Sequence, residues 1–234
     1  MRLHLLLIAS LNFALVATPA RGAAPSGPVD GIYIHFADAG LLTDCRTGKR
    51  LTVATEADNA ALERAYLDSR EAPGAPLWVS LLGHVESRPR QEGGGHEEVL
   101  VVDRFARVDP TRGCARSPGL ASARWRLVQL EGRAASISGQ PTPPFLLFKP
   151  ESGRLSGSTG CNRLNGEYRS WGVSGFAVLP LATTRMACPP PLGEQERHFL
   201  DALARATHRI QAGTQLELLA DGVPVARFEA DDLH

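Results

Sequence analysis

The segment Arg154–Cys188 constrains the fold more than any other part of this chain. It reads RLSGSTGCNRLNGEY, continues through a loop and closes on LATTRMAC. Glycine suits turns that need a positive φ, and asparagine is the next best residue there. The Asn165-Gly166 pair is typical of a β-hairpin turn. We therefore expect Cys161 and Cys188 to lie on neighbouring strands or loops of one small β-rich domain.

The N-terminus has the composition of a secretory signal peptide. Met1-Arg2 is a short basic region, Leu5–Val16 is an apolar region, and small residues follow. Such a run is too short for a comfortable membrane span. The cleavage region holds no cysteine that could carry a lipid anchor. We predict that residues 1–23 are removed and that the mature chain is periplasmic, without a transmembrane segment.

Export to an oxidising compartment favours disulfides among the four cysteines, for which three pairings are possible. We favour Cys45–Cys114 and Cys161–Cys188, because each pair then falls within one expected domain. In the chain-entropy model these loops would contribute about 4.4 and 3.6 kcal/mol. Cysteine and histidine do not recur at metal-ligand spacing, so we expect neither a metal nor another cofactor.

Residues 26–118 are expected to form the first domain, with three short strands, a helix and two longer strands. This order is typical of a small OB-type barrel. Thr55-Glu-Ala-Asp58 resembles a capping box that would start the helix. An OB fold can bind oligonucleotides through exposed aromatic side chains, here Tyr33 and Phe36. The formal net charge of zero argues against nucleic acid as a partner, so we expect these residues to pack in the core.

Residues 123–230 are expected to form the second domain, after a flexible linker over Ser117–Ala123. Strands are predicted at Ala123–Leu130 and Phe145–Phe148, and a helix with one apolar stripe at Glu194–Ala206. Two closing strands would follow, joined by an Asp221-Gly222 turn.

Two family resemblances fit this division. GCNRLNGEY, TTRMAC and a following E-x-x-F-L-x-A-L helix are similar to the META domain, the HslJ-like family of bacterial envelope and stress proteins. This resemblance implies a lipocalin-type antiparallel β barrel with one helix. The run GIYIHFADAGLLTDCRTGKRLTVA resembles the OB domain of NlpE-like envelope lipoproteins, although that family's C-x-x-C motif has no counterpart here. The expected fold is therefore mainly β with one helix per domain, an OB-like barrel followed by a META-like barrel.

The sequence contains none of the common catalytic motifs, such as G-x-S-x-G, H-E-x-x-H or S-x-x-K. We therefore predict that the protein is not an enzyme.

Polar residues crowd both arms of the expected Cys161–Cys188 bridge and form a candidate contact surface. Arginine can clamp a carboxylate or phosphate through two hydrogen bonds. A purely structural role, with asparagine in turns and threonine satisfying backbone groups, is the alternative. We expect Arg185 to make buried contacts and Arg163 to be exposed. The candidates are Asn162, Arg163, Asn165, Thr183, Thr184 and Arg185.

These features predict a non-catalytic exported envelope protein. It would serve as an envelope-stress or envelope-maintenance accessory, through contacts with another envelope protein or a surface component. The alternative is a protein that holds a small apolar ligand inside the META-like barrel. An open barrel interior would favour the ligand, and an interior filled by side chains would favour the contact protein.

Overall fold

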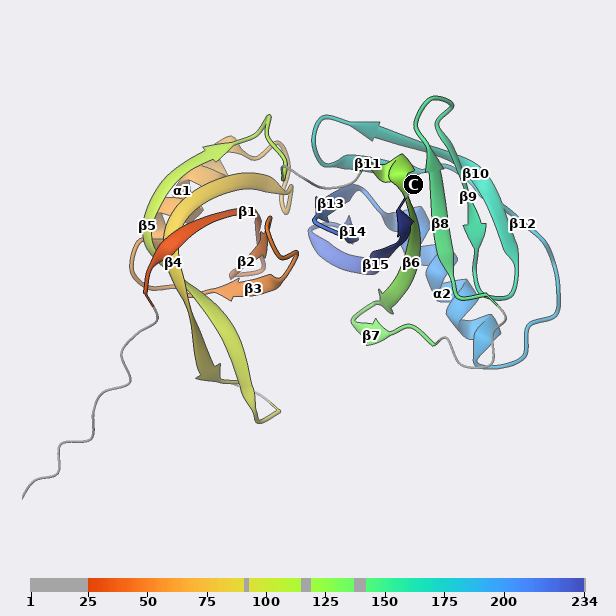
Figure 1. Cartoon of the computed structure of the whole chain (residues 1–234), viewed down its shortest axis with the longest axis horizontal. Helices are drawn as coiled ribbons and strands as arrows, with labels where there is room; N and C mark the ends of the chain where they lie inside the picture. The colour runs from red at the N-terminus through yellow and green to blue at the C-terminus, as the bar shows by residue number, and fades with distance from the viewer. Residues whose placement is uncertain (1–24, 91–92, 115–118, 137–141, 234) are drawn as a thin grey trace, which may run out of the picture.

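The computed structural model describes residues 25–90, 93–114, 119–136 and 142–233. The predicted signal peptide and part of the predicted linker lie outside these residues. The described chain is mainly β, with two α-helices, and forms two closed barrels that lie side by side (Figure 1). Neither α-helix has the length and apolar character needed to cross a bilayer. The expected fold class, with one helix in each domain, is confirmed.

Five strands and one helix make up the first barrel. The strand order is β1-β2-β3-β5-β4, and a parallel pairing of β3 with β5 closes the barrel. The predicted order of three short strands, a helix and two longer strands is confirmed. The elements are β1 (Gly27–Phe36), β2 (Ala39–Asp44), β3 (Arg50–Val53), α1 (Asn59–Ser69), β4 (Leu77–Pro89) and β5 (His96–Asp109).

The core of the first barrel explains why its aromatic residues are not a binding face. Tyr33 is fully buried and meets the ring of Tyr66 edge-on, with 5.2 Å between ring centroids. Burial raises the pKa of the Tyr33 hydroxyl. Phe36 at the end of β1 is exposed, so the expectation that it packs in the core is wrong. Gly31–Ile34 are all buried, because Tyr33 packs in the barrel core whereas Ile32 and Ile34 pack in the cluster shared with the second barrel.

The predicted capping box at Thr55–Asp58 is wrong. No side chain caps the N-terminus of α1, which begins at Asn59. The carboxylate of Asp58 instead accepts a hydrogen bond of 2.7 Å from the backbone N–H of Phe105. Asp58 therefore bonds to β5, which is remote in sequence, and does not cap the helix.

Eight strands close the second barrel, because β10 pairs with β11 as well as with β9. Two short strands, β7 and β12, pair along its edges. The strands are β6 (Ala123–Leu130), β7 (Arg133–Ala134), β8 (Phe145–Lys149), β9 (Arg154–Ser158), β10 (Arg163–Trp171), β11 (Gly175–Val178), β12 (Ala182–Thr183), β13 (His208–Ala212), β14 (Gln215–Ala220) and β15 (Val223–Leu233).

Large side chains fill the interior of the second barrel. The helix α2 (Leu192–Arg205) turns Phe199 and Leu203 toward this core, as its apolar stripe predicted. The core also contains a cluster of aromatic rings that are almost or completely buried. They are Trp125, Phe148, Tyr168, Phe176, Phe199 and Phe228.

Two turns test the turn predictions, with opposite results. The Asp221-Gly222 turn is confirmed, with φ values of 49° and 77° between β14 and β15. The predicted Asn165-Gly166 turn is wrong, because both residues lie inside the continuous strand β10. A Cβ on Gly166 would lie 2.6 Å from the Leu181 side chain, so glycine here lets Leu181 pack closely against the backbone of β10.

The linker prediction needs a partial correction. Residues 115–118 lie outside the described chain, and a 3-10 turn, η1 (Leu120–Ser122), follows. Leu120 is buried, and its carbonyl accepts a 2.9 Å hydrogen bond from Nε1 of Trp125. This end of the predicted linker therefore belongs to the second barrel.

The two barrels share an apolar contact. Ile32, Ile34 and Trp78 of the first barrel form one buried cluster with Ile210 and Leu219 of the second. Apolar side chains on the outside of a barrel are shielded from water only when another part of the protein packs over them. The hairpin β13–β14 therefore has two buried faces, one toward its own barrel and one toward the neighbour.

A buried carboxylate strengthens the same junction. Glu217 on β14 is only 2% exposed. Its carboxylate is paired with Nη2 of Arg50 from the first barrel. On the other side, Nε of Arg227 on β15 lies 2.9 Å from Oε1 of Glu217. A charge buried this deeply persists only when it is paired, so the two barrels depend on each other here.

Replacing Glu217 by glutamine tests the junction. We expect Glu217→Gln to lower the free energy of unfolding by about 3–5 kcal/mol, because two partly buried guanidinium groups lose their counter-charge. Urea denaturation measures the loss. The control is Glu229→Gln, which removes a partly exposed ion pair to Arg126 and should cost less than about 1 kcal/mol. Equal losses for the two variants would contradict this role of Glu217.

A histidine bridges the two strands of the long β4–β5 hairpin, the lower arm of the first barrel in Figure 1. Nδ1 of His84 lies 2.8 Å from Oδ2 of Asp103, and Nε2 lies 3.1 Å from Oε1 of Glu86. The hydrogen bond to Asp103, followed by the bond to Glu86, raises the pKa of His84.

A raised pKa in the folded state stabilises the fold below the unfolded value of about 6.5, and this stabilisation disappears as the pH rises through the folded pKa. We therefore expect His84→Gln to lose more stability relative to the wild type at about pH 5.5 than at about pH 8.5. Thermal unfolding at both pH values measures this. His96→Gln, which replaces an exposed histidine of β5, is the control. A loss for His84→Gln that is independent of pH would refute this assignment.

Candidate functional site

Both disulfides that the domain division favoured are present in the structure. Cys45 and Cys114 join the end of β2 to the chain after β5, with 5.1 Å between their Cα atoms. Cys161 and Cys188 join the turn before β10 to the segment before α2, with 6.0 Å between their Cα atoms. Each bridge lies within one barrel, and the second lies at the centre of the candidate surface.

Asn162 organises the polar cluster beside the second bridge. Its side chain is 2% exposed. Oδ1 accepts hydrogen bonds from Oγ1 of Thr184 at 2.7 Å and from the backbone N–H of Met186 at 2.8 Å. Nδ2 donates to the carbonyl of Met186 at 3.3 Å and contacts Sγ of Cys188 at 3.2 Å. The side-chain amide of Asn162 thus holds the segment from Thr184 to Cys188 in place.

A carboxylate from helix α2 completes the cluster. Both oxygens of Glu196 lie 3.0 Å from Nδ2 of Asn162, and Oε2 also accepts a bond from Oγ1 of Thr159. The same threonine hydroxyl accepts a 2.9 Å hydrogen bond from the backbone N–H of Asn162. The cluster therefore ties the turn before β10, the segment before α2 and the helix itself into one unit.

The structure separates the six candidate residues into two groups. Asn162 is buried, and Thr183 is half-buried in β12, where it pairs with Leu164 of β10. The other four candidates are exposed. They are Arg163, Asn165, Thr184 and Arg185.

The expectation of buried contacts for Arg185 is wrong. Arg185 is exposed, and the segment after β12 is held instead by the hydroxyl of Thr184 and the backbone N–H of Met186, which both donate to Oδ1 of Asn162. Arg163 is exposed as expected. Among the described residues, neither arginine forms an ion pair, so both guanidinium groups are available at the surface.

The sulfur atoms of Cys161 and Cys188 and the carboxylate of Glu196 lie within 4.8 Å of one another. Such a set could hold a metal ion only if both sulfurs were thiolates. Because both sulfurs belong to the disulfide, the donors present do not suit a metal.

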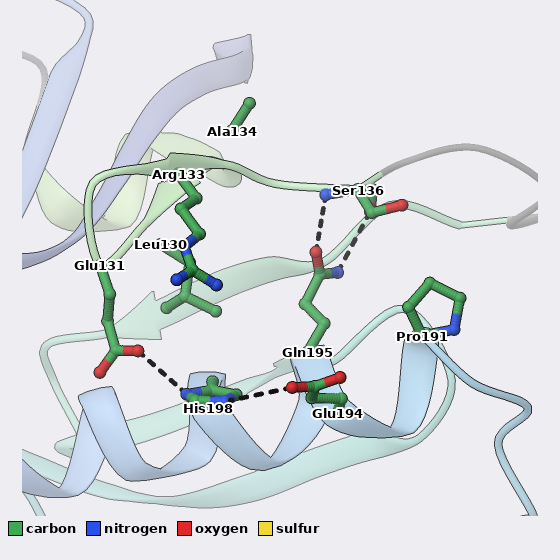
Figure 2. A pocket seen from close by; sticks show the side chains of 9 residues that line it. All are labelled: Leu130, Glu131, Arg133, Ala134, Ser136, Pro191, Glu194, Gln195 and His198. Carbon is green, nitrogen blue, oxygen red and sulfur yellow. Dashed lines mark hydrogen bonds and ion pairs between the residues drawn. The ribbon is translucent and has the colours of Figure 1, made fainter. Parts of the chain in front are cut away.

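A second group of polar side chains surrounds a surface cleft of about 350 Å³ between β7 and α2 (Figure 2). Nδ1 of His198 lies 3.0 Å from Oε2 of Glu131, which sits in a turn with φ of 47°. Gln195 accepts a 2.6 Å hydrogen bond from the backbone N–H of Ser136 and donates to its carbonyl at 3.1 Å. These bonds fasten the β7 segment to α2, so we assign the cleft a structural role. The pairing of His198 with Glu131 could not be predicted from the sequence, since 67 residues separate them.

Replacing Asn162 tests its structural role. We expect Asn162→Ala to lower the free energy of unfolding by about 3 kcal/mol, because a backbone N–H, a hydroxyl and a carboxylate lose a buried partner. Urea denaturation with both disulfides intact measures this. Asn165→Ala, three residues away and exposed, should change stability by less than about 0.5 kcal/mol. Similar small changes in both variants would show that the cluster does not support the fold.

Comparisons with known proteins agree with the two-barrel division. Residues 118–232 match the META domain, and residues 23–115 match the NlpE C-terminal OB domain. Over 106 residues the chain is 36% identical to lipoprotein NlpE of Escherichia coli (strain K12). The matched region covers 44% of this chain and 43% of that protein. The match therefore spans less than half the length of this curated relative.

Solved structures include similar chains. The crystal structure of the Cpx pathway activator NlpE from Escherichia coli is 31% identical, over 46% of this chain and 54% of that chain, with a TM-score of 0.35. The NMR structure of a protein from Burkholderia xenovorans is 27% identical, over 48% of this chain and 83% of that chain, with a TM-score of 0.40. Two family models thus match successive parts of the chain, the NlpE C-terminal OB domain over the first barrel and the META domain over the second.

Proposed function

We propose that this protein is a non-catalytic exported envelope protein that acts as an envelope-stress or envelope-maintenance accessory through contacts with another envelope protein or a surface component. The similarity to lipoprotein NlpE over the first barrel, combined with a META domain, is the observation that carries this proposal. The similarity covers 43% of NlpE, so it supports a shared envelope setting more directly than a shared activity.

The cysteine chemistry supports export. All four cysteines are paired, and no free cysteine occurs among the described residues. Disulfides of this kind persist in oxidising compartments such as the periplasm. The basic and apolar pattern of the first 23 residues is consistent with the same destination.

The surface around the Cys161–Cys188 bridge is the contact site that we propose. Arg163 and Arg185 present exposed guanidinium groups that form no ion pair within the described part of the chain, and such groups suit carboxylate or phosphate groups on a partner. Met186 stands beside them with 61% of its surface exposed, and methionine adapts readily to a partner's shape. The disulfide and the Asn162 amide hold the backbone beneath these side chains, which lowers the entropy lost on binding.

The filled interior of the second barrel does not favour the alternative of an apolar ligand. The rings of Trp125, Phe176 and Phe228 are fully buried in its core, and Phe199 of α2 packs against Phe228. A ligand in this position would have to displace packed side chains, which protein cores tolerate poorly.

A photo-crosslinking amino acid at position 186 tests the proposed contact surface in cells. We expect it to give a discrete higher-mass adduct in the periplasm. The Arg163→Ala/Arg185→Ala double variant should lower the adduct yield several-fold, because two charge-assisted contacts are lost. The same crosslinker at Trp171 is the control. Trp171 is also exposed, but it is the last residue of β10, whereas Arg163 of the contact surface is the first.

A discrete adduct at position 186 that is missing at position 171 would support the proposal, and an envelope-stress reporter in a strain lacking the protein should then respond abnormally. Equal adduct yields at both positions, or no adduct at position 186, would contradict the contact surface.

A further inference from the structure

A cleft of about 280 Å³ lies at the junction of the two barrels, away from the proposed contact surface. The first barrel and the chain just after it contribute Ile32, Pro76 and Arg112, and the second barrel contributes Val173 and Arg209. The cleft thus combines apolar walls with two arginine side chains. Neither the disulfide cluster nor the family matches account for this combination.

Arg209 on β13 is a half-buried cation without an acidic partner. Its hydrogen bonds are long, 3.5 Å from Nε to Oγ of Ser170 and 3.4 Å from Nη1 to Oε1 of Gln211. Among the described residues, no carboxylate forms an ion pair with it. Burial lowers the pKa of its guanidinium. A cation removed from water in this way is costly unless something neutralises its charge.

Arg112 brings a second cation to the same cleft. Its guanidinium lies over the ring of Trp78, 4.2 Å from the centroid. Asp109 is the nearest acid along the chain, and its Oδ1 accepts bonds from the backbone N–H of Thr111 at 3.0 Å and from its hydroxyl at 2.8 Å. These bonds lower the pKa of Asp109, and the charge of Arg112 adds to the effect from a distance. In the described parts of the chain Arg112 forms no ion pair either. Stacking on an aromatic face leaves the N–H donors at the edge of a guanidinium free to bind.

We propose that the junction cleft binds the phosphate group of a small molecule or of a lipid headgroup, with Arg209 and Arg112 as its charged ligands. An anion there would neutralise the half-buried cation of Arg209, where electrostatic attraction exceeds that in bulk water, and the exposed guanidinium of Arg112 would add a second charged contact. The apolar walls formed by Ile32 and Val173 can accommodate a short apolar part of the same molecule. A ligand that touches both barrels also stabilises their arrangement.

A titration of the full chain with inorganic phosphate, at constant ionic strength, tests the site. We expect saturable NMR shifts of the Nε–Hε signals of Arg209 and Arg112. Arg209→Gln and Arg112→Gln should each weaken phosphate binding by about tenfold or more, as expected for a lost bond to a charged group. Arg154→Gln, which replaces an exposed arginine on β9, should bind phosphate like the wild type. If Arg209→Gln fails to fold, Arg209→Lys keeps the charge, loses the planar fork and should still bind more weakly.

Flotation with vesicles separates the two sources of phosphate. Binding to phosphatidylglycerol vesicles but not to phosphatidylcholine vesicles, lost in Arg209→Gln, would assign the site to a headgroup. Saturable binding of inorganic phosphate without flotation would assign it to a soluble phosphate. The proposal is overturned if inorganic phosphate shifts neither arginine signal and the protein does not float with phosphatidylglycerol vesicles, or if both glutamine variants bind with wild-type affinity. The contact surface around Met186 would stand in either case, since it lies at a different site.

Discussion

The fold depends most on the carboxylate of Glu217, which is buried between the two barrels. A charge at this depth is stable only because Arg50 comes from one barrel and Arg227 from the other. Each barrel closes its own sheet and packs its own core, so neither needs the other to form hydrogen-bonded strands. The Arg50–Glu217 ion pair and the shared apolar cluster make the two barrels one unit, because separation would break that pair and expose several isoleucine and leucine side chains.

This joined arrangement has consequences for function. The cleft that contains Arg209 and Arg112 exists only while the barrels hold their positions, so its chemistry belongs to the pair and not to either family alone. The surface around the Cys161–Cys188 bridge differs in this respect. It is formed by the second barrel and is held locally by Asn162 and Glu196. The proposed contact surface thus depends on the second barrel alone, and the proposed phosphate site depends on both barrels together.

Local and repetitive features could be predicted from the sequence. The apolar stripe of α2 and the Asp221-Gly222 turn each depend on near neighbours, and the structure confirms them. The turn predicted at Asn165-Gly166 is wrong because the sequence does not distinguish a glycine that allows close packing, here against Leu181, from a glycine that a turn requires.

Long-range polar contacts could not be predicted in this way. Glu217 and Arg50 are 167 residues apart, and a charged residue in an alternating strand reads as a solvent-facing position. The same limit applies to the candidate site. The sequence predicts the polar segment next to the bridge, but it does not show that Asn162 is buried against Glu196 while Arg185 is exposed, because burial depends on which side chain meets helix α2.

The central claim, that the two barrels form one fixed unit, is tested most directly by residual dipolar couplings of the backbone amides in the oxidised full chain. The account predicts that couplings from both barrels fit a single alignment tensor, with the relative orientation seen in Figure 1. Two tensors that differ in magnitude or orientation would show that the barrels move independently, and would contradict both the fixed junction and the cleft built upon it.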